Sequence, residues 1–416
     1  MDRYRLQLFY PGIGFKRWVL ALVLGVLLFG FGVFVAVAAI VSYDVLGAVG
    51  LGFLRGRYFV TGVLAGGSLM AGLAGIYLGL LGVARFARTS APGVEQMRSV
   101  ARLARGPRVV AVGGGTGLAA LLGGLKHRTS NLTAIVTVAD DGGSSGLLRR
   151  SMGVLPPGDI RSCLVALADD ESLMRQLFQY RFREGGLEGH SFGNLFVAAL
   201  AEVTGDFERA VQESTSVLKV RGRVLPATLQ NVELHAEVEG GEQVTGESSI
   251  TAHARRPLHV WLEPRDAPAL PQALAAVEQA DIVVLGPGSL FTSVIPNLLI
   301  PQVADALRKT SARVIYVCNV MTQPGETDDF GAADHVAALH RHGAGGLIDV
   351  VLVNDTPAPS SVSALYERKG ATPVAADDER LRALGVQVVH AEVAGGSDVF
   401  RHDPARLADA VLRLVP

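Results

Sequence analysis

A run of four glycines and one threonine is the first place in this 416-residue chain where residue types and spacing suggest chemistry. The run follows an apolar segment at 108–112. Because glycine tolerates positive φ and has no Cβ, such a turn lets backbone N–H groups approach an anion at a helix N-terminus. The loop lacks the Lys of a Walker A motif, and Leu118 stands where a dinucleotide fingerprint has its third glycine. The pattern predicts a phosphate-binding loop, with a simple tight turn as the alternative. Its residues are Gly113, Gly114, Gly115, Thr116 and Gly117.

Two adjacent aspartates, Asp140 and Asp141, follow the next apolar segment, at 133–139, and Ser144 and Ser145 come shortly after them. Mg²⁺ prefers one or two carboxylates, while substrate phosphates and water complete its shell. Both loops follow strands, and ligands in open α/β sheets collect at the carboxyl ends of the strands. The two loops together predict a nucleotide or other phosphate ligand. A helix cap and turn is the alternative for the aspartates.

A third segment, PPGDIR at 156–161, introduces a helix. Asp159 is either the acid that begins this helix or a further carboxylate near a metal, and Arg161 could then hold a phosphate. The candidate Mg²⁺ ligands are thus Asp140, Asp141 and Asp159. Farther on, His190 beside Ser191 could handle protons, but a helix cap formed by Ser191 or Asn194 explains these residues equally well.

Polar residues also follow two later strands. Gly288 and Ser289 lie in the loop 286–293, and Cys318 and Asn319 end the strand at 314–317. Cys318 could be a nucleophile, but no clear base adjoins it, so a packed thiol is the preferred interpretation. Four strand-end loops of this composition form one polar rim, which is typical of α/β ligand-binding proteins.

The order of the apolar segments predicts an α/β fold with a doubly wound, mainly parallel sheet. Strands are expected at 108–112, 133–139, 281–285, 314–317, 348–354 and 386–393, and helices at 160–184, 193–203, 206–218 and 404–414. Residues 224–264 alternate about a Gly240-Gly241 turn. This alternation predicts a small β-hairpin insertion or a small β layer.

A two-helix transmembrane hairpin is predicted for residues 1–85, with the helices at about 18–43 and 58–84. Neither segment carries a charge, and each exceeds the roughly 20 residues that cross a bilayer core. Basic residues flank both outer ends, with only Arg55 and Arg57 in the short connecting loop. Both termini and the main domain, 108–416, are therefore expected in the cytoplasm. Residues 86–107 are expected to be a basic juxtamembrane linker.

Glycines in the second apolar segment have the small-residue spacing that suits close helix packing, although glycine is also simply common in membrane helices. They are Gly66, Gly67, Gly72, Gly75, Gly79 and Gly82.

Charge and cysteine content exclude other classes of protein. Residues 1–107 carry 11 Lys and Arg against three acids, whereas the remainder carries 27 against 36. An acidic body disfavours nucleic acid as the main ligand. The only cysteines, Cys163 and Cys318, exclude a disulfide-rich scaffold and a multi-cysteine zinc site.

Eight motifs resemble, in order, those of the bacterial gluconeogenesis factor, or YvcK-like, family. They are GGGTGL, TVADDGGSSG, PPGDIR, GHSFGNL, VRGRVLPA, GPGSLFTSVIPNLL, CNVMTQPGET and RHD. The resemblance covers about 108–416 and leaves 1–107 outside it. The family belongs with the CofD-like 2-phospho-lactate transferases, so the resemblance implies a Rossmann-like fold. It also implies UDP-sugar binding, notably of UDP-N-acetylglucosamine, and a link to gluconeogenic growth, peptidoglycan synthesis and cell shape.

Carried onto this sequence, the resemblance places the glycine loop and the three aspartates at the phosphate and metal part of a cleft. It implies a sugar-nucleotide contact from Tyr366 and another from Arg401. Other cleft residues that it implies are Ser144, Asn194, Gly288, Ser289 and Asn319. One departure is Phe291, which stands where the family often has Tyr, so a hydroxyl is lost there.

Two functions follow from these patterns. The first is a UDP-sugar-binding regulator, tethered to the bacterial cytoplasmic membrane, with no obligatory cofactor, with cell-wall synthesis proteins as partners, and able to form homo-oligomers. The alternative is a CofD-type, Mg²⁺-dependent 2-phospho-L-lactate transferase that uses a nucleotide-diphosphate-activated donor, because phosphoryl chemistry can rest mostly on positioning and charge stabilisation. A pyridine-nucleotide dehydrogenase is excluded, since the glycine pattern breaks and no ribose-binding acid follows.

Overall fold

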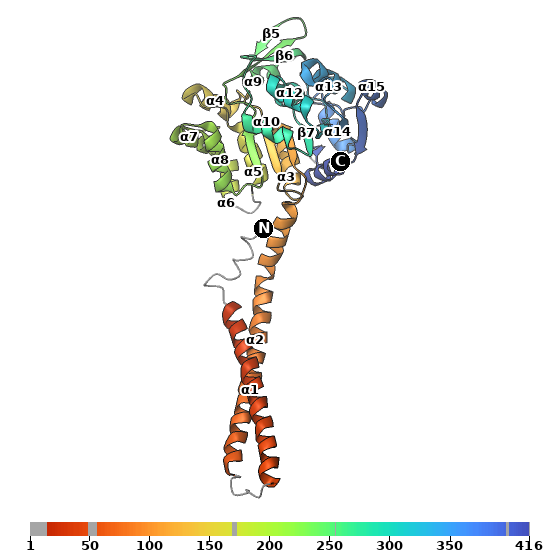
Figure 1. Ribbon diagram of the computed structural model, residues 1–416. Coiled ribbons are helices and arrows are strands. Elements are labelled where there is room, and N and C mark those ends of the chain that lie inside the picture. Colours follow the sequence, from red (N-terminus) through yellow and green to blue (C-terminus); the bar gives the residue numbers. More distant parts are fainter. Residues whose placement is uncertain (1–14, 49–55, 169–172, 254, 397–398, 416) are drawn as a thin grey trace. The chain divides into compact units, whose positions relative to one another are not determined.

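The computed structural model describes residues 15–48, 56–168, 173–253, 255–396 and 399–415. The chain divides into two compact units, Met1–Val100 and Ala101–Pro416. The first is helical, and the second is an α/β body (Figure 1).

Two long helices, α1 (Phe15–Ala48) and α2 (Gly56–Leu103), form the first unit, and α2 continues into the start of the second. Their apolar segments, Trp18–Val41 and Val60–Ala84, have mean hydropathies of 2.8 and 1.7 and are long enough to cross a membrane. The prediction of two helices of this length and composition is confirmed. Residues 86–103, part of the segment expected to be a juxtamembrane linker, continue α2 as helix.

Four of the six glycines expected to favour close helix packing lie against α1. A Cβ added at Gly72 would lie 2.5 Å from the backbone nitrogen of Phe29, so no larger residue fits without a shift. Gly66 and Gly67 differ, because a Cβ there would meet no heavy atom within 4 Å. The remaining three that contact α1 are Gly75, Gly79 and Gly82.

A seven-stranded sheet in the order β10-β9-β8-β7-β1-β2-β3 forms the centre of the second unit, and every neighbouring pair is parallel. The strands are β1 (Val109–Gly113), β2 (Leu132–Val136), β3 (Arg223–Pro226), β7 (Ile282–Leu285), β8 (Arg313–Val317), β9 (Val350–Asn354) and β10 (Gln387–Ala391). From β1 the chain builds outward to β2 and β3, then crosses to β7 and builds the other way. The strand order therefore reverses between β1 and β7, which is where doubly wound folds bind ligands.

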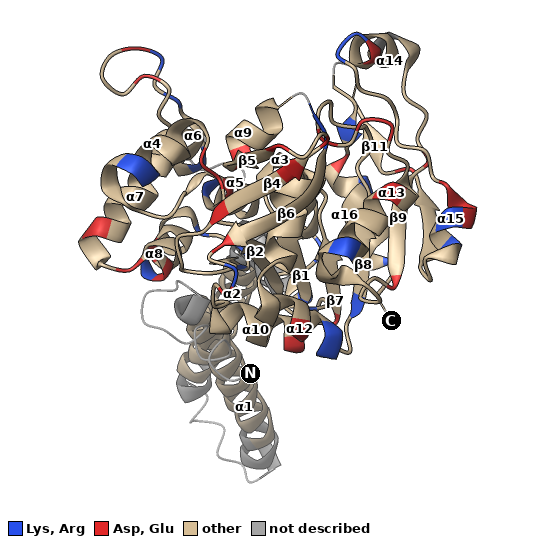
Figure 2. Cartoon of the chain, turned by 90° about the horizontal axis from the view of Figure 1, so that it is seen from above, with Lys and Arg blue, Asp and Glu red and all other residues tan. Residues whose placement is uncertain are grey.

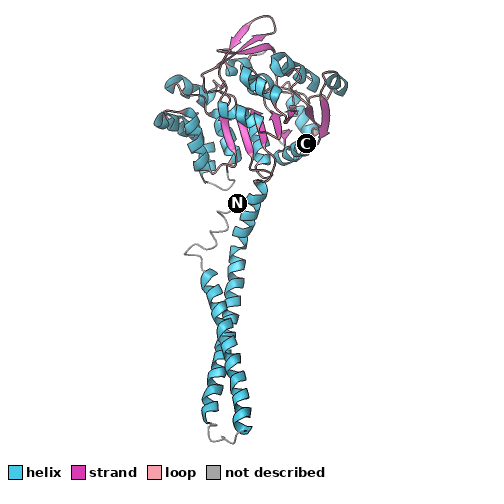
Figure 3. Cartoon of the chain, in the orientation of Figure 1, coloured by secondary structure: helices cyan, strands magenta, loops and turns pink. Residues whose placement is uncertain are grey.

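Helices cover both faces of this sheet (Figure 3). The side chains of β1 alternate between the two cores: Val110 and Val112 pack with one set of helices, and Val109 and Ala111 with the other. The strands β1, β2 and β7 carry no charged residue (Figure 2), as expected for strands buried on both faces. One set is α10 (Pro271–Glu278), α11 (Ile295–Leu298), α12 (Pro301–Lys309) and α13 (Ala332–Leu339). The other set is α3 (Gly115–Leu125), α5 (Gly158–Leu167), α6 (Leu173–Gln179), α7 (Phe192–Thr204), α8 (Phe207–Leu218) and α16 (Pro404–Leu412).

The segment expected to be a β-hairpin insertion or a small β layer contains such a layer. Its first residues form β3 of the main sheet, and the rest forms an antiparallel three-stranded sheet in the order β5-β4-β6. These strands are β4 (Glu233–Val238), β5 (Gln243–Thr245) and β6 (Pro257–Glu263), with helix α9 (Glu247–Ala252) between β5 and β6. The Gly240-Gly241 turn that we identified joins β4 to β5.

The prediction of one helix over residues 160–184 was wrong. α5 ends at Leu167, and the next described helix, α6, runs only from Leu173 to Gln179. The remaining elements are α4 (Gly143–Met152), the π-helical turns η3 (Leu290–Val294) and η4 (His340–Ala344), α14 (Ser360–Glu367), α15 (Asp378–Ala383) and the short pair β11 (Ala394–Gly395) and β12 (Arg401–His402).

Candidate functional site

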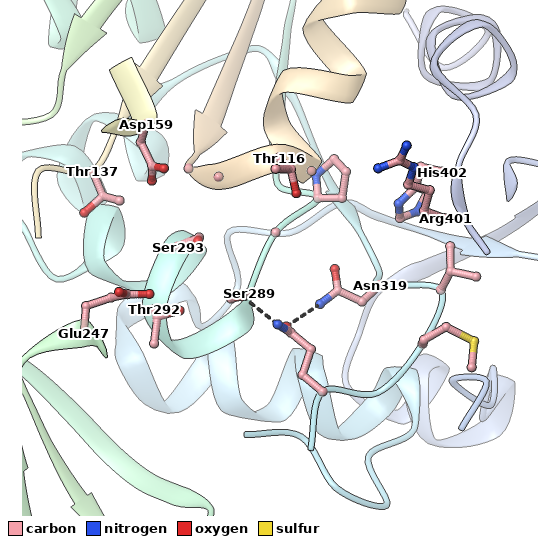
Figure 4. Close-up of a pocket in the computed structure, with 18 of the residues that line it drawn as sticks. Thr116, Thr137, Asp159, Glu247, Ser289, Thr292, Ser293, Asn319, Arg401 and His402 are labelled. Atoms are coloured by element: carbon pink, nitrogen blue, oxygen red, sulfur yellow. Dashed lines mark hydrogen bonds between the residues drawn. The ribbon is translucent and has the colours of Figure 1, made fainter. Parts of the chain in front are cut away.

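A cavity of about 380 Å³ opens at the carboxyl ends of β1 and β7, at the reversal of strand order. Its walls come from the glycine loop after β1, the loop after β7, the loop after β8, the start of α9 and the β12 segment (Figure 4). The lining includes these expected residues: Gly114, Gly115, Thr116, Gly117, Asp140, Asp159, Gly288, Ser289, Asn319 and Arg401.

The glycine loop brings backbone against the cavity in the way the sequence predicts. Gly115 has φ +66°, and a Cβ at Gly117 would lie 2.6 Å from the carbonyl oxygen of Pro287. Gly117 therefore permits the close approach of the two strand-end loops. Gly114, the N-cap of the 11-residue helix α3, and the first residues of that helix line the cavity, with the Asp159 carboxylate beside them. Gly113 lies just behind, as the last residue of β1.

Carboxylates form one end of the cavity. Burial, followed by the repulsion of Asp140, raises the pKa of Asp159 to about 6, against the stabilising N–H of Gly115 and the charge of Arg161. Burial also raises the pKa of Asp140. Glu247, at the start of α9, faces the same end, and burial followed by repulsion from Asp140 and Asp159 raises its pKa to about 7. This end of the cavity therefore favours bound cations or protons.

Asp141 does not line the cavity, contrary to our expectation. Its Oδ1 accepts a hydrogen bond from the backbone nitrogen of Ser248 at 2.8 Å, and its other carboxylate oxygen lies against Gly246. Asp141 thus holds the start of α9. Of the paired aspartates, only Asp140 lines the cavity.

Asp140 and Asp159 satisfy the carboxylate requirement of Mg²⁺ in a nucleotide site, since that ion takes its remaining ligands from phosphate and water. The two side chains repel each other across a shared cavity wall, and a cation between them would relieve that repulsion. In the part of the chain that the structure describes, no group of three or more His, Cys, Asp or Glu side chains is arranged to hold a metal. The residues present fit a metal that arrives with a phosphate ligand.

A chain of neutral polar groups lines the floor of the cavity. The Nε2 of Gln323 donates to the Oγ of Ser289 at 2.8 Å, and the Nδ2 of Asn319 donates to the Oε1 of Gln323 at 3.4 Å (Figure 4). Thr292 and Ser293 of η3 add hydroxyls. These groups can hydrogen-bond hydroxyl or amide groups of a ligand in either direction.

The turn η3 itself is fixed by a buried acid that the sequence did not reveal. Glu326 is 3% exposed, and its Oε1 accepts from the backbone nitrogen of Phe291 at 2.8 Å. Burial raises the pKa of Glu326 to about 7, while the N–H groups of Phe291 and Thr292 oppose this. The ring of Phe291 is fully buried and points into the core.

Arg401 and His402 lie at the opposite end of the cavity (Figure 4), whose lining also includes Phe400, Val320 and Met321. Arg401 is exposed, and its guanidinium makes no hydrogen bond or ion pair with any described residue. Tyr366, expected to contact the ligand, lies outside the lining and donates from its hydroxyl to the carbonyl of Phe400 at 3.3 Å. The resemblance thus identified one lining residue and one residue that supports it.

Four other expected residues lie behind the cavity wall. The Oγ of Ser145 accepts from Asn194 at 3.4 Å, and the Oδ1 of Asn194 accepts from the Nε of Arg161 at 2.8 Å. The Oγ of Ser144 lies 3.2 Å from the Nδ1 of His190. Packing here is close, because a Cβ at Gly158 would collide with both Ser145 and Asp140. The hydrogen bonds and this close packing together fix the wall from which Asp140 and Asp159 project.

Both cysteines are buried, and for Cys318 this agrees with the packed thiol expected from the sequence. Cys163 is fully buried and Cys318 is 1% exposed. Burial raises the pKa of the Cys318 thiol to about 12, so it is a packed thiol and not an activated nucleophile.

No pattern in the sequence marked Glu247, Gln323 or His402 as a lining residue. Glu247 comes from the insertion, which folds back over the strand ends, and only the tertiary structure brings it there. Gln323 and His402 belong to the motifs CNVMTQPGET and RHD, but no local pattern there indicated a role for them.

Fold and cavity together define a Rossmann-like α/β protein with a polar, strand-end site at its topological switch point. The sequence profile described as 2-phospho-L-lactate transferase CofD matches residues 109–394. The chain belongs to the gluconeogenesis factor family within the CofD-like superfamily.

The relatives differ in how much of the chain they share. A putative gluconeogenesis factor from Nostoc is 47% identical over 417 residues, covering 97% of this chain and 91% of the relative. The gluconeogenesis factor of Bacillus subtilis is 48% identical over 311 residues, covering 74% of this chain and 98% of the relative. Similarity therefore extends into the N-terminal helices in some relatives, which corrects the limit of 108–416 that the motifs suggested.

A crystal structure of a UPF0052 family member from Bacillus halodurans is similar to the body of this protein. It has a TM-score of 0.71 and 48% sequence identity, and the match covers 74% of this chain and 99% of that chain. A body of this size thus folds in a relative without the helical segment.

Proposed function

We propose that the protein binds a UDP-sugar, of the UDP-N-acetylglucosamine type, at the switch-point cavity and acts as a membrane-tethered regulator. In this role it links gluconeogenic carbon supply to peptidoglycan synthesis and cell shape. The observation that carries the proposal is the polarity of one cavity: the N-terminus of α3 in the middle, carboxylates at one end and Arg401 at the other.

A nucleotide diphosphate matches that polarity. Its phosphates suit the first turn of α3, because the N–H groups of a first turn and the helix dipole attract anions. Arg401 lies free at the same cavity and supplies the counter-charge. The amide and hydroxyl groups of Ser289, Asn319 and Gln323 suit sugar or uracil groups. The volume of about 380 Å³ falls within the usual range for small-ligand sites.

Two features favour a binding role over turnover. The Cys318 thiol is buried with its pKa raised to about 12, and His402 is neutral because burial lowers its pKa to about 4. Cys318 and His402 therefore do not provide the activated nucleophile and base that covalent catalysis requires. The names of the relatives refer to gluconeogenesis and not to a reaction.

The two apolar helices support the tether. We assign both as membrane spans with both termini cytoplasmic, since basic residues flank their outer ends. The body would then lie at the face of the cytoplasmic membrane where UDP-sugars are consumed. Cell-wall synthesis proteins are the partners we expect there.

A Mg²⁺-dependent transferase is the second candidate, favoured by the carboxylate end of the cavity. Asp140 and Asp159 would hold the ion at a diphosphate, and the ion would neutralise charge on the transferred group. The protein's own part would be positioning, through the α3 N-terminus and Arg401.

Calorimetric titration tests both candidates. UDP-N-acetylglucosamine, UDP-glucose, GDP and GTP would be titrated, each with and without Mg²⁺, into the full chain in detergent micelles. Micromolar binding of the UDP-sugars, weakened about 10- to 100-fold in Arg401→Ala, supports the regulator. Arg209→Ala, an exposed arginine on α8, is the matched control. Binding of guanine nucleotides alone, dependent on Mg²⁺ and lost in Asp140→Asn, would contradict the regulator and favour the transferase.

A further inference from the structure

A second cavity, of about 660 Å³, runs along α3 next to the first. Its walls come from α3, α5, α6 and the residues that follow Phe400. The two cavities share Thr116, Gly117, Arg401 and His402. Arg401 therefore borders both spaces, and a ligand in either one lies beside it.

The charge of the second cavity is opposite to that of the first. Lys126, Arg161, Arg175 and Arg401 line it, and none of its described lining residues is an Asp or Glu. The first cavity has Asp140, Asp159 and Glu247 in its lining. A concave site lined by one sign of charge concentrates ligands of the other sign, so the second cavity is suited to an anion.

Arg161 is held ready for such an anion. Its Nε donates to Asn194 and its Nη2 donates to the Oγ of Ser162 at 3.2 Å, and both of these partners are neutral acceptors. The stem lies against Gly193, where a Cβ would approach the Cδ of Arg161 to 2.8 Å. Burial, and then the nearby charge of Arg181, lowers the pKa of Arg161. A guanidinium that is fixed, crowded by another cation and without a carboxylate partner among the described residues gains from a bound anion.

His402 supplies a different group to the same space. Its Nε2 is buried with no hydrogen-bond partner in the described structure, and burial lowers the pKa of the ring to about 4, so the ring is neutral. A nitrogen of a neutral imidazole is either a donor or an acceptor, according to the tautomer. A ligand hydroxyl, which can both donate and accept, satisfies it in either case.

We propose that the second cavity binds a small phosphate monoester bearing hydroxyl groups, such as a sugar phosphate, together with whatever occupies the first cavity. The phosphate lies at Arg161 and Arg401, and a ligand hydroxyl forms a hydrogen bond with His402. This assignment moves Arg161 from the nucleotide, where the sequence placed it, to a separate ligand. It does not depend on the identity of the nucleotide.

One position allows a clean test of charge. Gly123 lines the second cavity only, and a Cβ added there meets no heavy atom within 4 Å. Gly123→Gln and Gly123→Glu have the same shape and differ by one negative charge, and both replace a helical glycine with a better helix former. The two variants therefore compare a neutral and a charged wall on the same fold.

Glucose 6-phosphate, inorganic phosphate and neutral glucose would be titrated into the full chain in detergent, with and without saturating UDP-N-acetylglucosamine. We expect glucose 6-phosphate to bind in both conditions, more tightly than phosphate, and glucose not to bind. Gly123→Glu should weaken glucose 6-phosphate about tenfold or more relative to Gly123→Gln, with equal UDP-sugar affinity in the two variants. Arg401→Gln should weaken both ligands.

Three results would overturn the proposal. They are displacement of glucose 6-phosphate by the UDP-sugar, equal affinity of the Gln and Glu variants, and absence of binding by glucose 6-phosphate. If the UDP-sugar does not bind, the proposed function fails, but the Gly123 pair still tests the second cavity on its own.

Discussion

The hydroxyl of Tyr366 donates a hydrogen bond to the backbone carbonyl of Phe400, with 3.3 Å between the two oxygens. The two residues also share a small apolar cluster with Val320 and Met321. Phe400 immediately precedes Arg401, which borders both cavities. Tyr366 is therefore placed to position Arg401 without touching the ligand.

Removing the Tyr366 hydroxyl should weaken UDP-sugar binding less than removing the Arg401 side chain. Tyr366→Phe keeps the packing and loses one neutral hydrogen bond, so we expect UDP-sugar affinity to fall about 2- to 10-fold. Arg401→Ala should lose more, because it removes a charged contact. Calorimetry on the two variants gives the comparison, and equal losses in both would mean that Tyr366 touches the ligand directly.

Substitutions of Asp140 and Asp141 should have different effects, one on Mg²⁺-dependent binding and the other on stability. Asp140→Asn should remove any Mg²⁺-dependent part of nucleotide affinity while leaving the fold intact, because Asp140 lines the cavity. Asp141→Asn should keep that Mg²⁺ dependence and instead destabilise the fold by about 1 kcal/mol, since it weakens the bond to Ser248. Nucleotide titration with and without Mg²⁺, together with thermal melts, distinguishes the two. Loss of Mg²⁺ dependence in Asp141→Asn would contradict the structural placement.

Glu247 should make the body less stable as pH rises. Its pKa is raised by burial and neighbouring carboxylates from 4.5 to about 7, so the folded protein binds a proton that the unfolded chain has released. Stability is therefore lost as pH rises from about 4.5 through about 7. Glu247→Gln should remove this penalty and stabilise the protein by about 1–3 kcal/mol at pH 8, with much less effect at pH 5.

Thermal melts of Glu247→Gln at both pH values measure this difference. The exposed Glu278→Gln on α10 serves as the control. A gain that is equal at pH 5 and pH 8 would show that ionisation of Glu247 is not its cause.

The helical segment offers a matched pair of glycines. Gly72→Ala would place a Cβ 2.5 Å from the backbone of Phe29 and force the helices apart, whereas Gly66→Ala enters open space. We expect Gly72→Ala to lower the concentration of sodium dodecyl sulfate at which helicity is lost, and Gly66→Ala to leave it nearly unchanged. Circular dichroism of the full chain during detergent titration checks this, and equal behaviour of the two variants would argue against the helix contact at Gly72.

Local sequence patterns identified much of the site, because parallel strands bring their carboxyl ends to one edge. The loops containing Gly114, Asp140, Gly288 and Asn319 each follow an apolar strand, and the sheet collects them in one cavity. The prediction that both aspartates hold a metal was wrong for Asp141. Only Asp140 lines the cavity, whereas the Asp141 carboxylate binds the backbone at the start of α9, a contact far along the chain that the local sequence does not show.

Long-range contacts account for the residues that the sequence did not reveal. Glu247 reaches the cavity because the three-stranded sheet of the insertion folds over the strand ends, and its distance along the chain from Asp140 gives no hint of this. Arg161 was assigned to the nucleotide because it follows Asp159 closely. On helix α5, however, the two side chains diverge, so that Asp159 lines one cavity and Arg161 the other.

The burial of both cysteines makes the protein ready for site-specific labelling. Burial raises the pKa of each thiol well above neutral, so neither Cys163 nor Cys318 offers a thiolate to a maleimide reagent at pH 7. A single cysteine placed at an exposed position, such as Val203→Cys on α7, where the native side chain is 83% exposed, would be the one reactive thiol. Fluorophores or spin labels can thus be attached to the otherwise unaltered chain to follow ligand binding in detergent or lipid.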